Sequence, residues 1–443
     1  MSKYAFSALV FICLAPVSIH AQTSLNLTVG EAVEIAMSKN TSIIIAEQKV
    51  QEQKAGIGEA RSLFFPKLSG RANYTRLDIA PYISFGKKSP FPLPPGSPSK
   101  FTIGDENLYD LGFTIMQPLF TGFALKNRYD IAVNSVKSVE NEYDTASMDV
   151  ILQVKEAYYS LLKTREMVKI SDESMKLIQA HIADLKRMQA VGLIAENDIL
   201  KAEVQLSEIK LQKIQTENAA ELIEKRLCMV LKISMDTDLI LTTPLEANDI
   251  EVSLESLTQQ AMEKRPEIKS LQNRIEIAKK SVSLVRSQRF PQISALYSWS
   301  YKRPNREYEK EFYDSWTVGL NAQLNIFDWG GIHYQIKQAE LQKRQAEEGM
   351  SQLKDFISLE VTQVYLNLQE AEERIKAAHI NVKQAEENYR VTQNKFSEGL
   401  VNNTEMLDAN AALTRARVAK TSALSDYLTS LANIERVAGK IGK

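Results

Sequence analysis

The chain has 443 residues, of which 44% are hydrophobic and 25% charged, a composition that is ordinary for a folded protein with a sizeable core. Its 54 lysines and arginines balance 55 aspartates and glutamates, which argues against a nucleic-acid-binding protein, because such a surface would be basic. Glycine and proline are scarce, at 17 and 13, and six of the prolines fall between Pro81 and Pro98. The rest of the chain is therefore free to form very long helices.

The first 21 residues have the pattern of a secretory signal peptide. Lys3 supplies the positive charge, residues 5–16 form an apolar run, and Ala21 is a suitable cleavage position. The alternative is an N-terminal membrane anchor, but the run is shorter than the roughly 20 residues that span a bilayer. Cys13 follows Ile12 instead of the small residue of a lipoprotein signal, so we expect no N-terminal acylation.

The two halves of the chain are similar to each other, which indicates an internal repeat. Residues 27–76 align with residues 252–301 at a constant shift of 225 positions. Residues 117–230 align without a gap with residues 324–437 at a shift of 207 positions. The difference, 225 minus 207, is 18 positions and equals the extra length of the proline-rich loop in the first half.

Each half is expected to be one structural unit, in the order helix, strand, loop, strand, very long helix, tight turn, helix. The expected domains are a signal peptide at 1–21, repeat one at 22–250 and repeat two at 251–443. Repeat one is expected to carry strands at about 67–78 and 108–119 and a helical hairpin at about 123–232. Repeat two is expected to carry strands at about 291–302 and 314–326 and a helical hairpin at about 331–438.

Two long segments favour helices that pack as coiled coils. Residues 124–191 contain no glycine or proline, and as a helix they would be about 100 Å long. Residues 332–398 are similar except for Gly349. Apolar residues recur every seven positions, which predicts left-handed coiled-coil packing. The two series are Val154, Leu161, Val168, Met175 and Ile182, and Val361, Leu368, Ile375, Val382, Tyr389 and Phe396. Helices alone would equally fit an ordinary soluble coiled coil.

The segments expected to be strands alternate between apolar and small polar residues. The alternation is clear in residues 68–74, 292–301 and 316–326 and weaker in 109–119. Period two over about ten residues is typical of a membrane barrel strand. Aromatic residues gather near the loop ends, as in an interfacial girdle. They are Tyr74, Tyr109, Trp299, Tyr301 and Trp316. The alternative is a soluble sheet with one wet face, which the signal peptide and the long helices disfavour.

Four strands per chain cannot close a barrel, and an open sheet edge in lipid would leave backbone groups unpaired at several kcal/mol each. Two copies would give eight strands with a filled interior, whereas three copies give twelve strands and a lumen. We therefore expect a homotrimer. The expected fold class is mixed α and β, a membrane β-barrel with four strands per protomer and twelve in the trimer, continued by a long coiled-coil α-barrel, with two tandem structural repeats.

Short motifs mark the helix–strand junctions and the hairpin tips in both halves. The junction motifs are Phe65-Pro66, Phe290-Pro291, Pro118-Leu119-Phe120-Thr121-Gly122 and Asn325-Ile326-Phe327-Asp328-Trp329-Gly330-Gly331. The tips carry Gly192-Leu193-Ile194-Ala195 and Gly399-Leu400-Val401, each followed by an acidic, apolar helix start. Each motif is weak alone. The ordered set, which occurs twice and spans the mature chain, resembles the TolC-like outer-membrane efflux channel family.

This resemblance implies a trimer with a twelve-strand barrel in the outer membrane of a Gram-negative bacterium and a twelve-helix tunnel in the periplasm. It implies the exit duct of a tripartite efflux or type I secretion system, which conducts substrates passively from periplasm to exterior. The implied partners are outer-membrane lipid, a periplasmic adaptor (membrane fusion protein) and an inner-membrane transporter of RND, ABC or MFS type, with no nucleic acid. The family exports drugs, metal ions, siderophores and polypeptides.

The resemblance also implies an acidic channel aperture at the periplasmic end of the tunnel. Glu405 and Asp408 occupy the family's acidic positions after the second hairpin tip, and Asp198 matches an acidic position of the first tip. Family members can latch the closed tip with a tyrosine and an arginine, but Phe396 and Val401 stand at those positions here. A polar latch at these two positions is therefore not expected.

Seven tip residues are expected to contact the adaptor: Gly192, Leu193, Ile194, Ala195, Gly399, Leu400 and Val401. The tip glycines and the acidic residues after the tips also have a purely structural interpretation. Glycines that end helices can act as C-caps with an apolar contact. Carboxylates in the first turn of a helix stabilise it, and Asn402 with Glu405 has the spacing of a capping pair.

No motif indicates catalysis or metal binding, so we expect no enzyme, no metal and no cofactor. The histidines are His20, His181, His333 and His379; none has a second ligand at metal spacing, and those of the mature chain are expected to face solvent or lumen. Cys228, the one cysteine after the signal, is expected to be a buried packing residue.

Two competing functions remain open. A periplasmic coiled-coil scaffold or adaptor without a membrane pore would need a lipoyl-like or β-barrel domain between its helices, and the sequence shows only two strands per half. A hydrolase that uses the tunnel carboxylates has no motif support. The loops at 78–106 and 302–314 are expected on the cell exterior if the chain is a channel.

Overall fold

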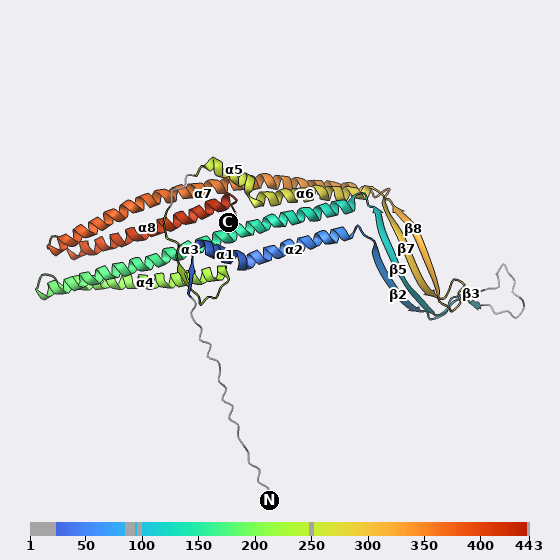
Figure 1. Cartoon of the computed structure of the whole chain (residues 1–443), viewed down its shortest axis with the longest axis horizontal. Helices are drawn as coiled ribbons and strands as arrows, with labels where there is room; N and C mark the ends of the chain where they lie inside the picture. The colour runs from blue at the N-terminus through green and yellow to red at the C-terminus, as the bar shows by residue number, and fades with distance from the viewer. Residues whose placement is uncertain (1–23, 85–93, 95–99, 248–251, 441–443) are drawn as a thin grey trace, which may run out of the picture. The chain divides into compact units, whose positions relative to one another are not determined.

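A computed structural model describes residues 24–84, 94, 100–247 and 252–440 (Figure 1). The expected signal peptide at 1–21 and the central part of the proline-rich loop lie outside these residues. The chain divides into two compact units, and each unit takes segments from both halves of the sequence. Unit 1 comprises Met1–Thr41, Val150–Glu251 and Leu366–Asn433, and unit 2 comprises Ser42–Asp149, Val252–Tyr365 and Ile434–Lys443.

The helices and strands alternate along the chain in the expected repeating order, with additional short elements. The first half contains β1 (Ser24–Leu27), α1 (Val29–Lys39), α2 (Thr41–Ser62), β2 (Lys67–Arg76), β3 (Tyr82–Ser84), β4 (Lys100–Thr102), β5 (Asn107–Phe120), α3 (Ala124–Ala190), α4 (Glu196–Leu231) and β6 (Asp238–Leu241). The second half contains α5 (Leu254–Lys264), α6 (Pro266–Arg286), the 3₁₀ helix η1 (Ser287–Arg289), β7 (Gln292–Arg303), β8 (Tyr313–Gln323), α7 (Gly331–Ser397) and α8 (Asn403–Val437).

The single helix expected before the first strand of each half is in fact two helices. The chain breaks at Asn40 between α1 and α2 and at Arg265 between α5 and α6, two positions that differ by 225, the shift of the repeat. Both residues have an extended backbone, with ψ of 132° and 126°. Pro266 explains the second break, since a residue before proline avoids the helical region and proline is well suited to begin a helix.

Four strands of unit 2 form one antiparallel sheet in the order β2-β5-β7-β8 (Figure 1). Residues that lie directly opposite each other share a face of the sheet. One row across the sheet is Leu68, Ile115, Tyr297 and Val318, and the next is Ser69, Thr114, Ser298 and Thr317. The alternation in the sequence therefore produces one apolar face and one polar face.

Two further strand pairs were not expected from the sequence, because each strand has only three or four residues. In unit 1, β1 pairs in parallel with β6. The hydroxyl of Tyr158 forms hydrogen bonds at the end of both strands. It donates to the Leu27 carbonyl at 2.8 Å and accepts from the Thr243 amide at 3.1 Å. In unit 2, β3 pairs with β4 at the base of the proline-rich loop.

The seven-residue series marks the packed side of the long helices α3 and α7. Val154 and Leu161 in α3 and Val361 in α7 are fully buried, and every other member of both series is buried or half-buried. This pattern confirms the coiled-coil interpretation of the helices. Across the described residues, no helix combines the length and the apolar character that crossing a membrane requires.

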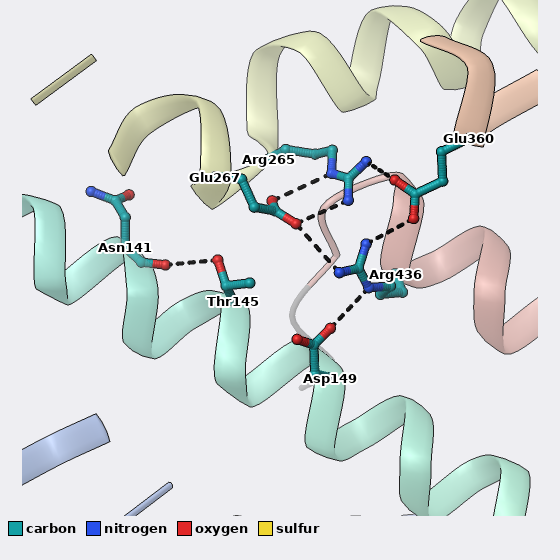
Figure 2. Close-up of polar contacts among 7 residues, drawn as sticks. All are labelled: Asn141, Thr145, Asp149, Arg265, Glu267, Glu360 and Arg436. Atoms are coloured by element: carbon teal, nitrogen blue, oxygen red, sulfur yellow. Dashed lines mark hydrogen bonds and ion pairs between the residues drawn. The ribbon is translucent and has the colours of Figure 1, made fainter. Parts of the chain in front are cut away.

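Unit 2 also contains a cluster of charged residues that the sequence did not reveal (Figure 2). Arg265, whose side chain is only 3% exposed, pairs with Glu267 at 2.9 Å and with Glu360 of α7 at 2.5 Å. Arg436 near the end of α8 pairs with Asp149 of α3 at 2.9 Å and with Glu360 at 3.1 Å. The cluster thus connects four helices within unit 2.

Candidate functional site

The first hairpin tip turns through a glycine with a left-handed backbone. Gly192 has φ of +77°, a conformation that glycine adopts without steric cost. Its amide donates to the Gln189 carbonyl at 2.9 Å, and the Leu193 amide donates to the Met188 carbonyl at 3.0 Å. These two bonds are those of a Schellman motif, which satisfies carbonyls at the end of α3.

The second hairpin tip repeats this geometry. Gly399 has φ of +73°, and its amide donates to the Phe396 carbonyl at 3.0 Å. The Leu400 amide donates to the Lys395 carbonyl at 2.8 Å. The structural interpretation of both glycines is therefore correct, and it leaves the side chains that follow them free for other contacts.

The residue after each glycine projects an apolar side chain into solvent. Leu193 is 69% exposed and Leu400 is 68% exposed. The next residues, Ile194 and Val401, are half-buried and pack against an apolar core beneath the tips. The buried members of that core are Ile178, Ile182, Leu185, Ile199, Ala202, Ile209, Tyr389, Phe396, Met406, Ala409 and Leu413. Each tip is thus a supported turn with one exposed leucine, and Ala195 is exposed beside the first.

Of the three expected aperture acids, Asp198 lies in the first turn of α4 and Glu405 in the first turn of α8, while Asp408 lies in the next turn of α8. Glu405 and Asp408 are exposed and form no ion pair with another described residue, whereas Asp198 is half-buried. The Glu405 amide donates to the side-chain oxygen of Asn402 at 3.0 Å, which confirms half of the capping pair. The carboxylates of Glu405 and Asp408 are therefore not needed to neutralise a neighbouring cation within this chain.

A buried polar chain connects the two hairpins just behind these acids. The imidazole Nε2 of His181 lies 2.7 Å from the amide oxygen of Asn403, and the Asn403 side-chain nitrogen donates to the Asp198 carbonyl at 2.9 Å. His181 is 5% exposed and packs edge-on against Phe396. The expectation that His181 faces solvent or lumen is wrong, because it shares the buried face of α3 with Leu185 one turn later. His333 and His379 are exposed as expected.

Two more polar layers join the hairpins farther along the helices. The hydroxyl of Ser174 donates to the Asn410 side chain at 2.9 Å, and Thr414 donates to Ser174 at 2.9 Å. In the next layer Arg417 of α8 pairs with Glu173 of α3 at 2.8 Å and with Glu386 of α7 at 3.0 Å. The latch that the family places at the positions of Phe396 and Val401 is thus absent from those positions, while other residues provide polar contacts between the hairpins.

A cavity of about 660 Å³ lies between α3 and α7 near the tips. Its lining combines apolar residues such as Met188 and Met406 with Asp184 and Tyr389. Burial, with a smaller contribution from Asp184, raises the pKa of Tyr389. The tyrosine hydroxyl therefore stays neutral at physiological pH and adds no charge to the wall.

Comparison with known proteins identifies the family. The family model described as "Outer membrane efflux protein" matches residues 32–231 and 257–440. The chain belongs to this family. Outer membrane protein TolC of Vibrio cholerae serotype O1 is 19% identical over 344 residues, which cover 76% of this chain and 78% of TolC. Proteases secretion protein PrtF of Dickeya chrysanthemi is 20% identical over 354 residues, which cover 76% of this chain and 74% of PrtF.

A solved structure shows the same fold. The outer membrane channel CmeC of Campylobacter jejuni superposes with a TM-score of 0.78 at 17% identity, covering 99% of this chain and 94% of CmeC. The mixed α and β fold class and the resemblance expected from the motifs are therefore confirmed. The protein is an outer-membrane efflux channel of a Gram-negative bacterium with a periplasmic extension.

The helix–strand junctions of this efflux channel present exposed aromatic rings. Phe65 is 57% exposed, Phe290 is 48% and Phe327 is 70%. Phe120 packs edge-on against Phe123, and the pairing of β5 with β7 shifts register between Pro118 and Phe120. Pro66 and Pro291 directly precede β2 and β7, where proline costs no ladder hydrogen bond.

The part of the chain that the structure describes presents neither a metal site nor a reactive thiol. Within the described ranges, no group of three or more histidine, cysteine, aspartate or glutamate side chains is placed to hold a metal ion. Cys228 is fully buried, as the sequence predicted, and burial raises the pKa of its thiol. Its role is packing at the end of α4.

Proposed function

We propose that three copies of this chain form the exit duct of a tripartite efflux or type I secretion system. The observation that carries this proposal is the open sheet of unit 2. Among the described strands, the edge strands β2 and β8 each have a neighbour on one side only. In lipid the free edges would leave backbone groups unpaired at several kcal/mol each, and pairing β8 of one copy with β2 of the next removes the cost. Three copies give twelve strands, enough for a lumen.

The hairpin tips are the surface that would meet a periplasmic adaptor. Two exposed leucines, Leu193 and Leu400, follow hydrogen-bonded turns, and an amphipathic helix of a partner could cover such apolar side chains. Through the adaptor the channel would receive cargo from an inner-membrane transporter of RND, ABC or MFS type. Both the efflux system and the secretion system have support, since the family model is described as an efflux protein and PrtF is named for protease secretion.

The same proposal assigns passive conduction to the chain and no chemical step. It includes cleavage of a signal peptide at residues 1–21 and the two tandem repeats at 22–250 and 251–443. The exposed acids Glu405 and Asp408, with Asp198, would line the periplasmic aperture as threefold rings. Rings of carboxylates in a narrow pore favour cations.

Fractionation and gel analysis test this proposal. We expect the protein in the outer-membrane fraction, as a detergent-soluble oligomer that dissociates only on heating. Light scattering in detergent should give three times the chain mass of 49.9 kDa, after correction for the removed signal peptide and for the bound detergent. Recovery as a water-soluble monomer in the periplasmic fraction would favour the coiled-coil scaffold and would refute the pore.

A further inference from the structure

The two faces of the four-stranded sheet differ in their polar character. On the polar face, hydroxyls contact each other across the strands: Thr114 lies 3.2 Å from Ser298, and Ser300 lies 3.0 Å from Ser315. On the other face aromatic rings pack in the rows between these, with Phe113 stacked on Trp299 at 5.6 Å. In a membrane barrel the apolar face meets lipid and the polar face lines the lumen.

The polar face carries an excess of positive charge. Among the residues of β2, β5, β7 and β8 that share this face, the charged ones are Lys67, Arg71, Lys302 and Asp110. Three cations against one carboxylate leave a net charge of plus two per chain. The opposite face of the same strands carries Arg76, Arg303 and Asp314.

Three of the polar-face charges form one group. Arg71 Nη2 lies 3.1 Å from a carboxylate oxygen of Asp110, and Lys302 Nζ lies 3.9 Å from the same carboxylate. Asp110 therefore lies between cations from β2 and β7 and neutralises only one of them. The side chains of Arg71 and Lys302 are 51% and 39% exposed, so their charge remains accessible to a solute.

We propose that Arg71, Asp110 and Lys302 form a positively charged belt on the luminal face of the barrel that favours the passage of solutes with anionic groups. The proposal rests on the trimeric pore proposed above, in which three copies of two cations and one carboxylate encircle the lumen. The belt has the opposite sign to the acids Glu405 and Asp408 at the hairpin tips.

The strength of this effect depends on ionic strength. The Debye length is about 8 Å at 0.15 M salt and about 30 Å at 0.01 M, so the belt reaches the centre of a wide lumen only in dilute salt. We therefore expect a small effect on ion selectivity in concentrated salt and a larger one in dilute salt.

Reversal potentials across planar bilayers with a salt gradient test the belt. Arg71→Gln with Lys302→Gln should shift the ratio of cation to anion permeability toward cations by about twofold at low salt, and Asp110→Asn should shift it toward anions. Arg71→Gln alone should give part of the first shift, and Arg76→Gln is its matched control, because it removes one positive charge from the same strand β2 but on the opposite face. Arg76→Gln should leave the ratio unchanged. Only variants that run as heat-modifiable oligomers are compared.

The outcomes separate the belt from the pore. Opposite shifts for the two belt variants, with no shift for Arg76→Gln, support the belt. Equal shifts for Arg71→Gln and Arg76→Gln would mean a general surface charge effect and would overturn the belt. Unchanged selectivity in all variants while wild-type conductance is normal would overturn it as well. A complete lack of conductance in the unaltered protein would overturn the pore itself and the belt with it.

Discussion

His181 of α3 and Asn403, the first residue of α8, lie 2.7 Å apart through the imidazole Nε2 and the side-chain amide oxygen. Both residues are buried, at 5% exposure each. Because Asn403 also donates to the Asp198 carbonyl at 2.9 Å, a single side chain links α3, α4 and α8 behind the tips. The two hairpins of one chain are therefore held together by directional bonds in addition to apolar packing.

Replacing Asn403 tests this link. Asn403→Ala leaves the imidazole of His181 buried without its partner, which should destabilise the folded state by about 1–3 kcal/mol. The midpoint of urea unfolding, followed by circular dichroism in detergent, measures the change. His379→Ala is the matched control, since His379 is exposed on α7, and an equal loss in both variants would contradict the role of the buried bond.

The buried arginine of unit 2 should be far more sensitive to substitution than an exposed one. Arg265→Ala leaves Arg436 as the remaining described cation that pairs with Glu267 and Glu360, and the loss of the charged hydrogen bonds from the buried Arg265 should cost about 1.5–3 kcal/mol. Arg286→Ala removes an exposed pair with Glu340 and should cost about 0–1 kcal/mol. The dissociation temperature of the oligomer on gels compares them, and similar temperatures would refute a structural role for the cluster.

The tip acids should contribute to ion selectivity. Glu405→Ala with Asp408→Ala removes two exposed carboxylates per chain that have no cationic partner in the described residues, so cation selectivity in planar bilayers should fall. Glu208→Ala with Glu221→Ala removes the same charge from exposed positions of α4. If the control pair lowers selectivity as much, the tip positions have no special role.

Cys228 should resist thiol reagents in the folded protein. The thiol is fully buried, and burial raises its pKa, so less of the reactive thiolate is present at pH 8 than for a free cysteine. Labelling by a maleimide at pH 8, located by peptide mass spectrometry, should be slow until denaturant is added. Ser207→Cys places a thiol at an exposed position of α4 and should label at once. Rapid labelling of Cys228 in native protein would contradict its packing role.

Regular patterns in the sequence predicted the main elements because each pattern reflects a repeating contact. Alternation in 68–74 and 292–301 marks a sheet with two different faces, and the series from Val154 to Ile182 marks the packed side of α3. The observed strands differ from the expected ones by no more than three residues at any end. The largest difference is at β8, which ends at Gln323 instead of 326.

Contacts between distant residues could not be predicted in the same way. His181 is one position before a member of the apolar series, and only the approach of α8 provides the Asn403 side chain that satisfies it. Arg265 resembles any other charged residue in the sequence, although its place before Pro266 signals a chain break. Its partner Glu360 is 95 positions away, so no local pattern connects them.

The parallel pairing of β1 with β6 sets a constraint on the order of biogenesis. Ser24 pairs with Asp238, so the start of the described chain finds its partner only after more than two hundred further residues have been secreted. Contacts of such large sequence separation slow folding, so we expect β1 to pair with β6 late. A translation product that stops before Asp238 would lack β6 and could not form this strand pair, even if its helices had formed.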